Sequence, residues 1–381
     1  MPRSALNYRT ASWRATLLAT SLAALLLLCA SRPTLAADAG KAKSVKAAKA
    51  AKAAKATKTV STATAVYDKH PLAIDFAAEV AERRGMDAAW LRGTLAQAQR
   101  LPAVQKLIMP PPAGTAKNWA AYRARFIEPQ RIRQGLDFWR QNEAWLHEAY
   151  ERWGVPAEVV VAIVGVETFY GRVTGNFRVI DALATLSFDF PTGRRDRSAF
   201  FREELEEFFV WCDREGVDPL TVQGSFAGAM GLPQFMPGSI NRFAVDFDGD
   251  GHIDLRRSTA DVVGSVAHYL ARHGWERGLA TTFDVAVPVD TADRATLLGP
   301  DILPTFSAAD FAARGAVLDP AGRAHDGPLA LVELQNGDRA PSHVAGTRNF
   351  WAITRYNWSS YYAMAVIDLA AELRQGRRAL R

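Results

Sequence analysis

The stretch that decides the fold reads Val155-Pro-Ala-Glu-Val-Val-Val-Ala-Ile-Val-Gly-Val-Glu-Thr-Phe-Tyr-Gly171. Read alone, its valine run fits either a buried strand or a buried helix, because a short apolar run does not separate the two. Pro156 suits the first turn of a helix and Gly171 suits its end. Helical patterns on both sides of the stretch favour a buried helix.

Glu167 is the chemically distinctive residue of this stretch, since no other charged residue occurs from Val159 to Glu167. A carboxyl group in apolar surroundings loses hydration, which penalises its anionic form and raises its pKa. Such a group can hold a proton near neutral pH and donate it to a glycosidic oxygen. The alternative is a glutamate at a helix end that merely reaches solvent.

The surrounding sequence is mainly helical. Apolar residues recur at three- and four-residue spacings between His70 and Trp153, with a break at Pro110-Pro111-Pro112. A second helical block extends to about Gly274, and helical signal returns from Tyr361 to Leu380. Between these blocks, residues 282–289 alternate with a period of two, and Leu329-Ala-Leu-Val-Glu-Leu334 is also strand-like, so we expect a small β-rich insertion.

Composition supports a globular protein with an unusual N-terminal part. Hydrophobic residues make up 49% of the 381 residues, which is enough for a sizeable core. The net charge is +6, but seven lysines lie between Lys41 and Lys58 in a segment of alanine, lysine and threonine. We interpret this segment as a solvated linker, with loose attraction to anionic cell-wall polymers or lipid headgroups as the alternative. A basic nucleic-acid binder would depend on this linker alone, so no nucleic-acid partner is expected.

The first 36 residues predict an export signal. Arg3, Arg9 and Arg14 precede an almost wholly apolar run, and Thr34-Leu-Ala36 offers small residues for cleavage. The apolar run is short for a membrane-spanning helix, which needs about 20 residues. The alternatives are an uncleaved anchor and lipidation of Cys29. Leu28 argues against lipidation, because it is large where a lipoprotein signal normally has a small residue. A periplasmic location follows from this interpretation.

Cleavage after residue 36 would leave Cys212 as the single cysteine and exclude an intrachain disulfide. Cys212 ends the apolar run Phe208-Phe-Val-Trp-Cys212, which is typical of a buried helix. We expect a small buried side chain here and no nucleophile.

A second unusual motif is Gly224-Ser-Phe-Ala-Gly-Ala-Met-Gly-Leu-Pro-Gln-Phe-Met-Pro-Gly-Ser239. Its four glycines let the backbone approach a ligand closely, and Gln234 can hydrogen-bond a sugar or acetamido group. A tight connection between helices is the structural alternative, but the density of special residues favours a ligand-binding loop.

An acidic loop, Asp246-Phe-Asp-Gly-Asp-Gly-His-Ile-Asp254, has the spacing of an EF-hand calcium loop. Carboxylates occupy positions 1, 3, 5 and 9, glycine occupies position 6, and His252 at position 7 would use its backbone carbonyl. Arg257 stands at position 12, where a bidentate glutamate is expected, and Asp261 could supply that carboxylate instead. The alternative is an Asp-Gly turn held by Asx hydrogen bonds. The predicted ligands are Asp246, Asp248, Asp250, His252, Asp254 and Asp261.

The motifs together resemble those of the B-type lytic murein transglycosylases of the lysozyme-like superfamily. The resemblance rests on Val164-Gly-Val-Glu-Thr168, Asp181-Ala-Leu-Ala-Thr-Leu-Ser-Phe188, Gly224 to Pro237, and Asn349-Phe-Trp-Ala-Ile-Thr-Arg-Tyr-Asn357, and it covers residues 70–381. It implies a mainly α fold: a lysozyme-like catalytic core, an additional helical domain and a small β domain. It also implies that one glutamate cuts the bond after N-acetylmuramic acid and forms a 1,6-anhydromuramyl end without water.

The resemblance assigns Glu167 as the acid/base and no cofactor for catalysis, with calcium as a structural ion. Ordinary glycosidases pair two carboxylates, and Asp181 and Asp189 stay open as partners. Asp196 stands before Arg197 where the family often has a second arginine, and whether Arg194 or Arg195 replaces it stays open. Helix packing is an equal alternative for Tyr362. The residues matched to the sugar cleft are Arg197, Ser225, Met230, Gln234, Phe235, Tyr269, Tyr356, Asn357 and Tyr362.

The predicted organisation is a signal peptide (1–36), a linker (37–66), a helical domain (67–153, completed by 349–381), a catalytic core (154–277) and a β domain (278–348). We expect a monomeric lyase that acts on peptidoglycan glycan strands, with cell-wall synthesis or remodelling proteins as further partners. The alternatives are a muramidase that uses water with the same glutamate, and a noncatalytic cell-wall binding protein stabilised by calcium.

Overall fold

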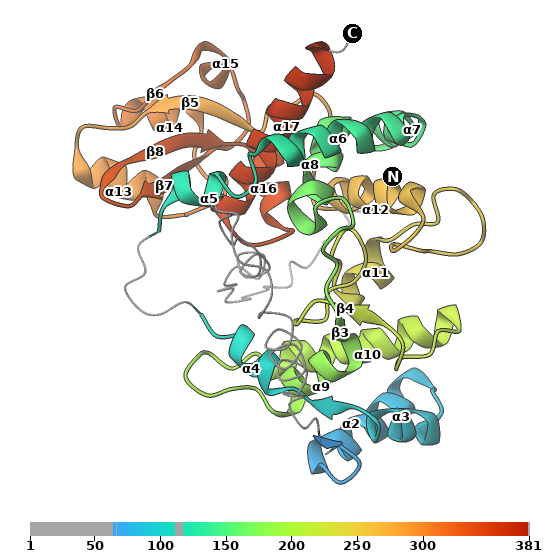
Figure 1. Cartoon of the computed structure of the whole chain (residues 1–381). Helices are drawn as coiled ribbons and strands as arrows, with labels where there is room; N and C mark the ends of the chain where they lie inside the picture. The colour runs from blue at the N-terminus through green and yellow to red at the C-terminus, as the bar shows by residue number, and fades with distance from the viewer. Residues whose placement is uncertain (1–63, 66, 111–116, 380–381) are drawn as a thin grey trace, which may run out of the picture.

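A computed structural model describes residues 64–65, 67–110 and 117–379 (Figure 1). The chain is mainly helical, as predicted, and its strands form small antiparallel sheets. The predicted signal segment 1–36, with Cys29, and almost all of the linker 37–66 lie outside the described residues. In the part of the chain that is described, no helix combines the length and apolarity needed to cross a bilayer.

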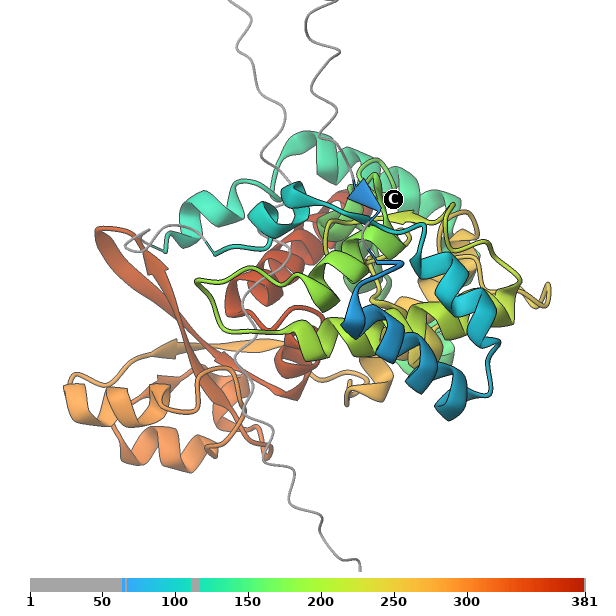
Figure 2. The same cartoon turned by 90° about the horizontal axis from the view of Figure 1, so that it is seen from below.

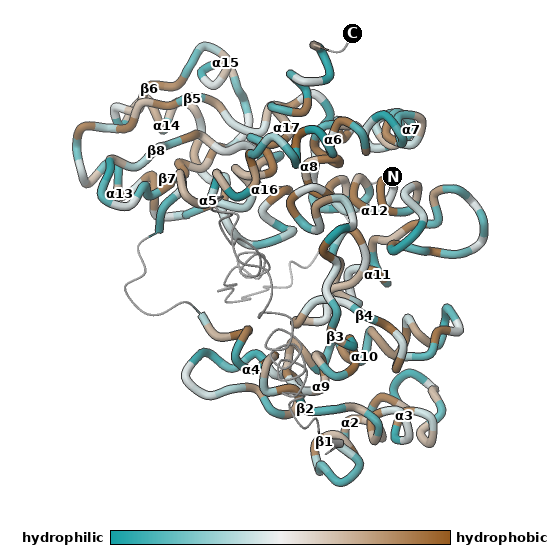
Figure 3. The backbone as a smooth tube through the Cα atoms, viewed as in Figure 1, coloured by the Kyte–Doolittle hydropathy of each residue, from teal (hydrophilic) through white to brown (hydrophobic). Residues whose placement is uncertain are grey.

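The valine-rich stretch is a helix, α8 (Ala157–Thr168), with Pro156 as its N-cap. Four helices pack against it: α6 (Pro129–Gln141), α7 (Glu143–Trp153), α12 (Thr259–Arg272) and α17 (Ser360–Ala379). Because α8 is surrounded, its apolar residues need no single face, which explains why they show no amphipathic period. Figure 3 shows brown hydrophobic segments where these helices meet.

A second group of helices lies at the other end of the molecule (Figure 1). Its members are α2 (Pro71–Arg84), α3 (Ala88–Leu95), α4 (Pro102–Leu107), α9 (Val179–Phe188) and α10 (Ser198–Glu215). The first two pack together, α4 packs on α9, and α9 lies along α10. The predicted buried helix around Cys212 is confirmed as part of α10.

Short strand pairs and short helices complete the helical part of the chain. Strand β1 (Thr64–Ala65) pairs with β2 (Gln99–Arg100), and β3 (Phe177–Arg178) pairs with β4 (Gln223–Gly224). The second pair places the start of the Gly-rich motif beside the beginning of α9. The remaining short helices are α5 (Trp119–Arg123), α11 (Pro237–Phe243) and α16 (Arg348–Thr354).

The predicted β-rich insertion is a four-stranded antiparallel sheet of order β6-β5-β8-β7. Its strands are β5 (Thr282–Ala286), β6 (Val317–Leu318), β7 (Ala330–Asn336) and β8 (Arg339–Gly346). The helices α13 (Thr291–Leu298), α14 (Ala308–Ala313) and α15 (Pro320–Arg323) join the strands. Together they enclose a small core of their own around Phe283, Phe311 and Leu331. In Figure 2 this orange and red unit projects to one side of the helical body.

The stretch 67–153, predicted as one helical domain, supplies helices to both groups. Its first three helices lie with α9 and α10, whereas α5, α6 and α7 lie around α8 and α17. Periodicity identifies helices but does not name their packing partners. The predicted domain boundaries stay a prediction.

Candidate active site

Helix α8 carries Glu167 in its last turn, at the junction of the surrounding helices. Residues 159–166 are buried, and Glu167 is partly buried. The next two residues, Phe169 and Tyr170, have left-handed backbone conformations with φ of 53° and 58°. Such conformations cost on the order of 1–3 kcal/mol each and persist where the surroundings hold them. Tyr170 is held between two glycines, because a Cβ at Gly135 or Gly165 would lie 2.3 or 2.5 Å from its hydroxyl oxygen.

The carboxyl of Glu167 has a raised pKa. Burial withdraws water from the charged form and raises the pKa of Glu167 to about 7, although a hydrogen bond from Tyr362 lowers it. The Tyr362 hydroxyl donates to Oε1 of Glu167 at 2.6 Å. The direction predicted from the apolar run is therefore confirmed. Near neutral pH the group populates both protonation states, which suits a group that donates a proton and then accepts one.

Aromatic side chains from distant parts of the sequence surround this carboxyl. Tyr356 stacks on Tyr362 with ring centroids 6.1 Å apart, and Tyr269 of α12 lies 4.8 Å from Tyr356. Phe235 contacts Tyr269 and Tyr356 at centroid distances of 5.3 and 5.6 Å. The Tyr356 hydroxyl donates to the Pro233 carbonyl at 3.0 Å, which ties the cluster to the Gly-rich loop. The structure thus brings together Glu167, Phe235, Tyr269, Tyr356 and Tyr362.

Gln234, in the same loop, has a left-handed backbone with φ of 51°. Its Nε2 donates to the carbonyls of Gly231 at 2.9 Å and Thr174 at 3.2 Å. Because that side of the amide faces two acceptors, the other atom must be Oε1. Among the described residues, no group donates to this buried oxygen. An unsatisfied buried acceptor is costly, so a ligand N–H or O–H that reached it would be stabilising.

Ser225 and Met230 also belong to this loop, and each is 2% exposed. The Ser225 Oγ accepts hydrogen bonds from the amides of Ala227 at 3.3 Å and Ala229 at 3.0 Å. Met230 pairs with Phe235 in an antiparallel bridge across the loop. Both residues shape the loop from inside, and direct contact between a sugar and either side chain stays a prediction.

Two predicted residues do not join the cluster through the contacts that the structure gives them. The Arg197 guanidinium, at the start of α10, lies over the rings of Phe200 at 4.5 Å and Phe201 at 5.7 Å. Burial lowers the pKa of Arg197, and the positive charges of neighbouring arginines lower it further. Asn357 is partly exposed beside Tyr356 in the chain. Their roles in substrate binding stay predictions.

Tyr122 of α5 is a cluster member that the sequence did not single out, since its spacing indicated only a helical core position. Its hydroxyl is buried and has no hydrogen-bond partner among the described residues. Burial raises the pKa of Tyr122, and the negative charge of Glu167 raises it further, so the two groups are close enough to interact electrostatically. An unpartnered hydroxyl beside the acid/base candidate marks Tyr122 as a functional candidate. No sequence pattern could reveal it, because Tyr122 and Glu167 come near each other only in the folded chain.

The acidic loop brings together three of its predicted ligands. Carboxylate oxygens of Asp246, Asp248 and Asp261 lie within 4.8 Å of one another. Asp261 is in the first turn of α12 and accepts backbone hydrogen bonds from Phe247 at 2.8 Å and Asp254 at 2.7 Å. The cluster of hard oxygen donors fits a calcium ion, and Asp261 lies where the missing twelfth ligand would be needed.

The predicted calcium ligands also make local hydrogen bonds, and Asp246 accepts from the amides of Gly249 and Gly251, each at 2.8 Å. Oδ1 of Asp250 accepts from the His252 amide at 2.8 Å, and Oδ1 of Asp254 accepts from the amides of Arg256 and Arg257 at 2.8 and 3.0 Å. These are Asx bonds of the kind that the alternative interpretation requires. Asp250 and Asp254 are not part of the three-carboxylate group.

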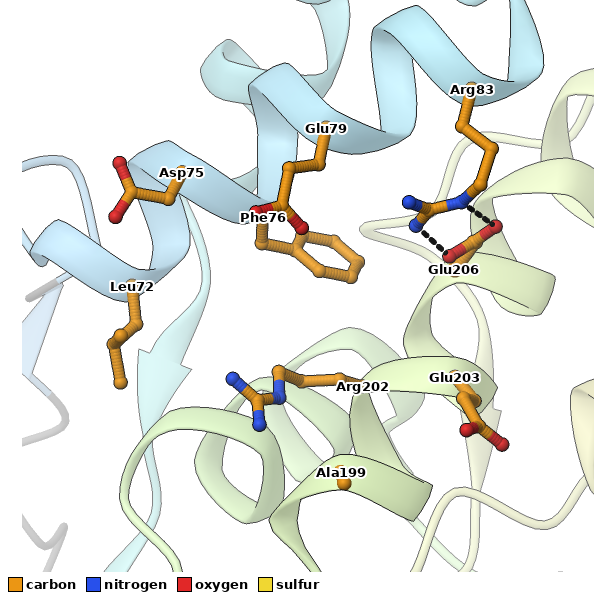
Figure 4. Close-up of a pocket in the computed structure, with 9 residues that line it drawn as sticks. All are labelled: Leu72, Asp75, Phe76, Glu79, Arg83, Ala199, Arg202, Glu203 and Glu206. Carbon is orange, nitrogen blue, oxygen red and sulfur yellow. Dashed lines mark hydrogen bonds and ion pairs between the residues drawn. The ribbon is translucent and has the colours of Figure 1, made fainter.

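A separate pocket of about 290 Å³ lies between α2 and α10, far from these residues in the fold. Phe76 and Ala199 contribute apolar surface to it, and Arg202 points into it (Figure 4). Arg83 closes one side through an ion pair with Glu206 at 2.5 Å. The pocket shares no residue with the Glu167 cluster.

Comparison with known proteins finds similar proteins over most of the chain. The profile of the family described as Transglycosylase SLT domain matches residues 68–371. Membrane-bound lytic murein transglycosylase B of Escherichia coli K12 is 39% identical over 312 residues, which cover 80% of this chain and 82% of the relative.

Two solved structures extend this comparison. Soluble lytic transglycosylase SltB1 from Pseudomonas aeruginosa is 40% identical, with a TM-score of 0.73, and the match covers 81% of this chain and 99% of that one. The Escherichia coli lytic transglycosylase Slt35, solved in complex with calcium, is 38% identical, with a TM-score of 0.70, and the match covers 81% and 94% of the two chains.

Proposed function

The chain belongs to the transglycosylase SLT family, and we propose that it cleaves the β-1,4 bond between N-acetylmuramic acid and N-acetylglucosamine in peptidoglycan. It is a lytic transglycosylase of the same kind as its relatives. The proposed product end is 1,6-anhydromuramic acid, and Glu167 is the single acid/base. The observation that carries the proposal is the partly buried carboxyl of Glu167, which has a raised pKa and accepts a hydrogen bond from Tyr362.

In the proposed reaction, protonated Glu167 gives its proton to the glycosidic oxygen as the bond from C1 to that oxygen breaks. The resulting carboxylate then takes the proton from the muramyl 6-hydroxyl as O6 bonds to C1. The proton returns to Glu167, and no water is consumed. A pKa of about 7 serves both halves, because neither protonation state is strongly disfavoured near neutral pH.

The surroundings of Glu167 support a mechanism with one carboxylate. The side chain that hydrogen-bonds its carboxyl is a tyrosine, Tyr362, and not a second carboxylate. The two aspartates considered as partners are engaged elsewhere: Asp181 binds Arg178 at 2.7 Å, and Asp189 accepts from Tyr67 at 2.8 Å. Glycosidases with two carboxylates need the second within about 10 Å of the first and aimed at the same bond. Internal attack by the 6-hydroxyl removes that need.

Substrate binding is proposed to use the aromatic cluster and the Gly-rich loop. Aromatic faces suit the C–H faces of sugars, and the free Oε1 of Gln234 suits an acetamido N–H or a hydroxyl. The proposed contacts are Arg197, Ser225, Met230, Gln234, Phe235, Tyr269, Tyr356, Asn357 and Tyr362.

We also propose a structural Ca²⁺ held by Asp246, Asp248 and Asp261, with the His252 carbonyl as a further ligand. Support comes from the cluster of three carboxylates and from the calcium complex of Slt35. The ion would stabilise the loop before α12, the helix that carries Tyr269, and would take no part in the reaction.

Export to the periplasm by a cleaved signal is proposed from residues 1–36, with lipidation of Cys29 as the alternative. We propose that the mature chain acts as a monomer on peptidoglycan strands. N-terminal sequencing and intact mass of the exported protein distinguish cleavage near residue 36 from an acylated Cys29.

The experiment that tests the reaction is digestion of purified peptidoglycan in ¹⁸O-labelled water. Lytic transglycosylation yields products one water lighter than hydrolysis products, with no ¹⁸O at the new end. Incorporation of one ¹⁸O per cleavage would instead establish a muramidase with the same glutamate. No soluble product from a folded, calcium-loaded sample would favour the noncatalytic binding protein.

A further inference from the structure

We infer that the hairpin formed by β7 and β8 is a positioning element of the active site. Its tip holds α5, which places the Tyr122 ring against Tyr361, next to the Tyr362 that hydrogen-bonds Glu167. The inference rests on the proposed role of Glu167. It assigns a role in catalysis to the β insertion, and it names Tyr361 and Gly337 as positioning residues that do not themselves touch the substrate.

Helix α5 cannot fix its own position. It has five residues, and its local support is one cap, in which Oδ1 of Asn118 accepts from the Ala121 amide at 3.0 Å. Isolated helices shorter than about 12–15 residues are marginal in water. The place of α5, and therefore of Tyr122, must be set by tertiary contacts.

The hairpin supplies one set of these contacts through its tip. Asn118 forms an antiparallel bridge with Asn336, the last residue of β7. The amide of Gly337, the next residue, donates to the Lys117 carbonyl at 3.1 Å. Gly337 has φ of 65°, and a Cβ there would lie 3.1 Å from Nδ2 of Asn118. Glycine thus lets the hairpin tip reach the residues that begin α5.

Tyr361 connects the hairpin, α5 and the catalytic cluster. Its hydroxyl donates to the Gln335 carbonyl of β7 at 3.0 Å. Its ring meets Trp119 and Tyr122 edge-on, with centroids 5.8 and 5.7 Å away. The next residue in the chain is Tyr362, which donates a hydrogen bond to Glu167. A displacement of β7 would therefore reach Tyr122 through a single side chain.

Helix α5 is also anchored to α17 by an ion pair between Arg123 and Asp368 at 2.5 Å. Strand β7 itself is held from both faces. Leu331 is buried in the core of the insertion, whereas Val332 and Leu334 are buried in the main core. Since side chains alternate along a strand, β7 contributes buried side chains to both cores. Helix α5 thus packs against both β7 and α17.

The test compares Gly337→Ala and Tyr361→Phe with Gly315→Ala. Gly315, also in the insertion, has φ of 76° and nothing within 4 Å of a Cβ, so its substitution brings the same kind of backbone strain without touching α5. We expect both test variants to lower kcat about tenfold with KM nearly unchanged, as a small misplacement of a catalytic side chain does. The control should keep the parental kcat and lose as much thermal stability as Gly337→Ala.

Two further readouts separate positioning from general damage. Tyr122→Phe should lower kcat, and adding Gly337→Ala to it should lower kcat little more, because both changes act on the same hydroxyl. Amide hydrogen exchange of residues 120–124 should become faster in Gly337→Ala but not in Gly315→Ala. The inference is overturned if Tyr122→Phe keeps full activity, if the two effects multiply, or if α5 exchange is unchanged. Because exchange needs no substrate, its result is independent of whether the proposed reaction is correct.

Discussion

Burial of Glu167 has two consequences at the scale of a single residue. It raises the pKa of Glu167 to about 7, which keeps a proton on the carboxyl near neutral pH, and it makes the charged form costly in the folded protein. In the unfolded chain the group titrates near 4.5. Below that pH both states are protonated and the folded protein bears no penalty. As pH rises toward 7 the unfolded chain loses its proton first, so stability falls.

We therefore expect Glu167→Gln to be more stable than the parent at pH 8 by roughly 1–3 kcal/mol, with a much smaller difference at pH 4. Urea unfolding at the two pH values measures this. A difference that does not depend on pH would contradict the assigned pKa.

Tyr362 is the second residue whose effect has a definite sign. Its hydrogen bond stabilises the carboxylate and lowers the pKa of Glu167. Tyr362→Phe should raise that pKa, so the protonated acid persists and the alkaline limb of the pH–kcat profile moves to higher pH. Tyr150→Phe is the control. Tyr150 is on α7, and its ring lies under the Arg277 guanidinium. An alkaline limb that stays in place, or moves to lower pH, would argue against this hydrogen bond.

The raised pKa was predictable from sequence because the apolar residues around Glu167 are its chain neighbours. The Tyr362 donor was not, since the two residues are 195 positions apart and meet only when α17 packs on α8. Tyr122 was missed for the same reason.

At the scale of elements, the strands and helices that depend on local pattern were predicted and those that depend on pairing were not. Strand β8 has no alternating pattern and contains Pro341, yet it pairs with both β5 and β7. A register shift near Gln335 accommodates the proline, which has no amide hydrogen for a regular ladder. For α8 the flanking helical patterns, and not its own periodicity, predicted a helix, because a helix buried on all sides has no amphipathic period.

The acidic loop gives a prediction at this scale. A metal that binds only the folded chain stabilises it, so chelation should lower the melting temperature by several degrees, and added Ca²⁺ should restore it. Asp246→Asn should abolish this response, whereas Asp301→Asn, outside the loop, should preserve it. Identical melting temperatures with and without chelator would leave the Asx-turn interpretation in place.

At the scale of the whole molecule, the mainly helical fold with a small β insertion was predicted and is confirmed. The distribution of the helices of residues 67–153 over two groups was not predictable. An amphipathic pattern shows that one face of a helix is buried, but not which element packs against that face. The two groups share one continuous core, in which Cys212 is 1% exposed.

Cys212 reports on that core. Burial raises the pKa of its thiol, and the side chain has almost no accessible surface. In a chain that starts at residue 37, we expect thiol reagents to label Cys212 only as fast as the protein unfolds. Adding Ala199→Cys, at an exposed position on the same helix, should give one rapidly labelled site. Rapid stoichiometric labelling of the unmodified native chain would show that α10 is not packed as described.

The most direct test of the central claim, that Glu167 is the single acid/base of a lytic transglycosylase, is mass spectrometry of muropeptides released from purified peptidoglycan. The parent and Glu158→Gln, a change on the same helix, should both release 1,6-anhydromuropeptides. Glu167→Gln should release none while its circular dichroism and glycan binding match the parent. Anhydromuropeptides from Glu167→Gln at a rate within a few-fold of the parent would contradict the claim.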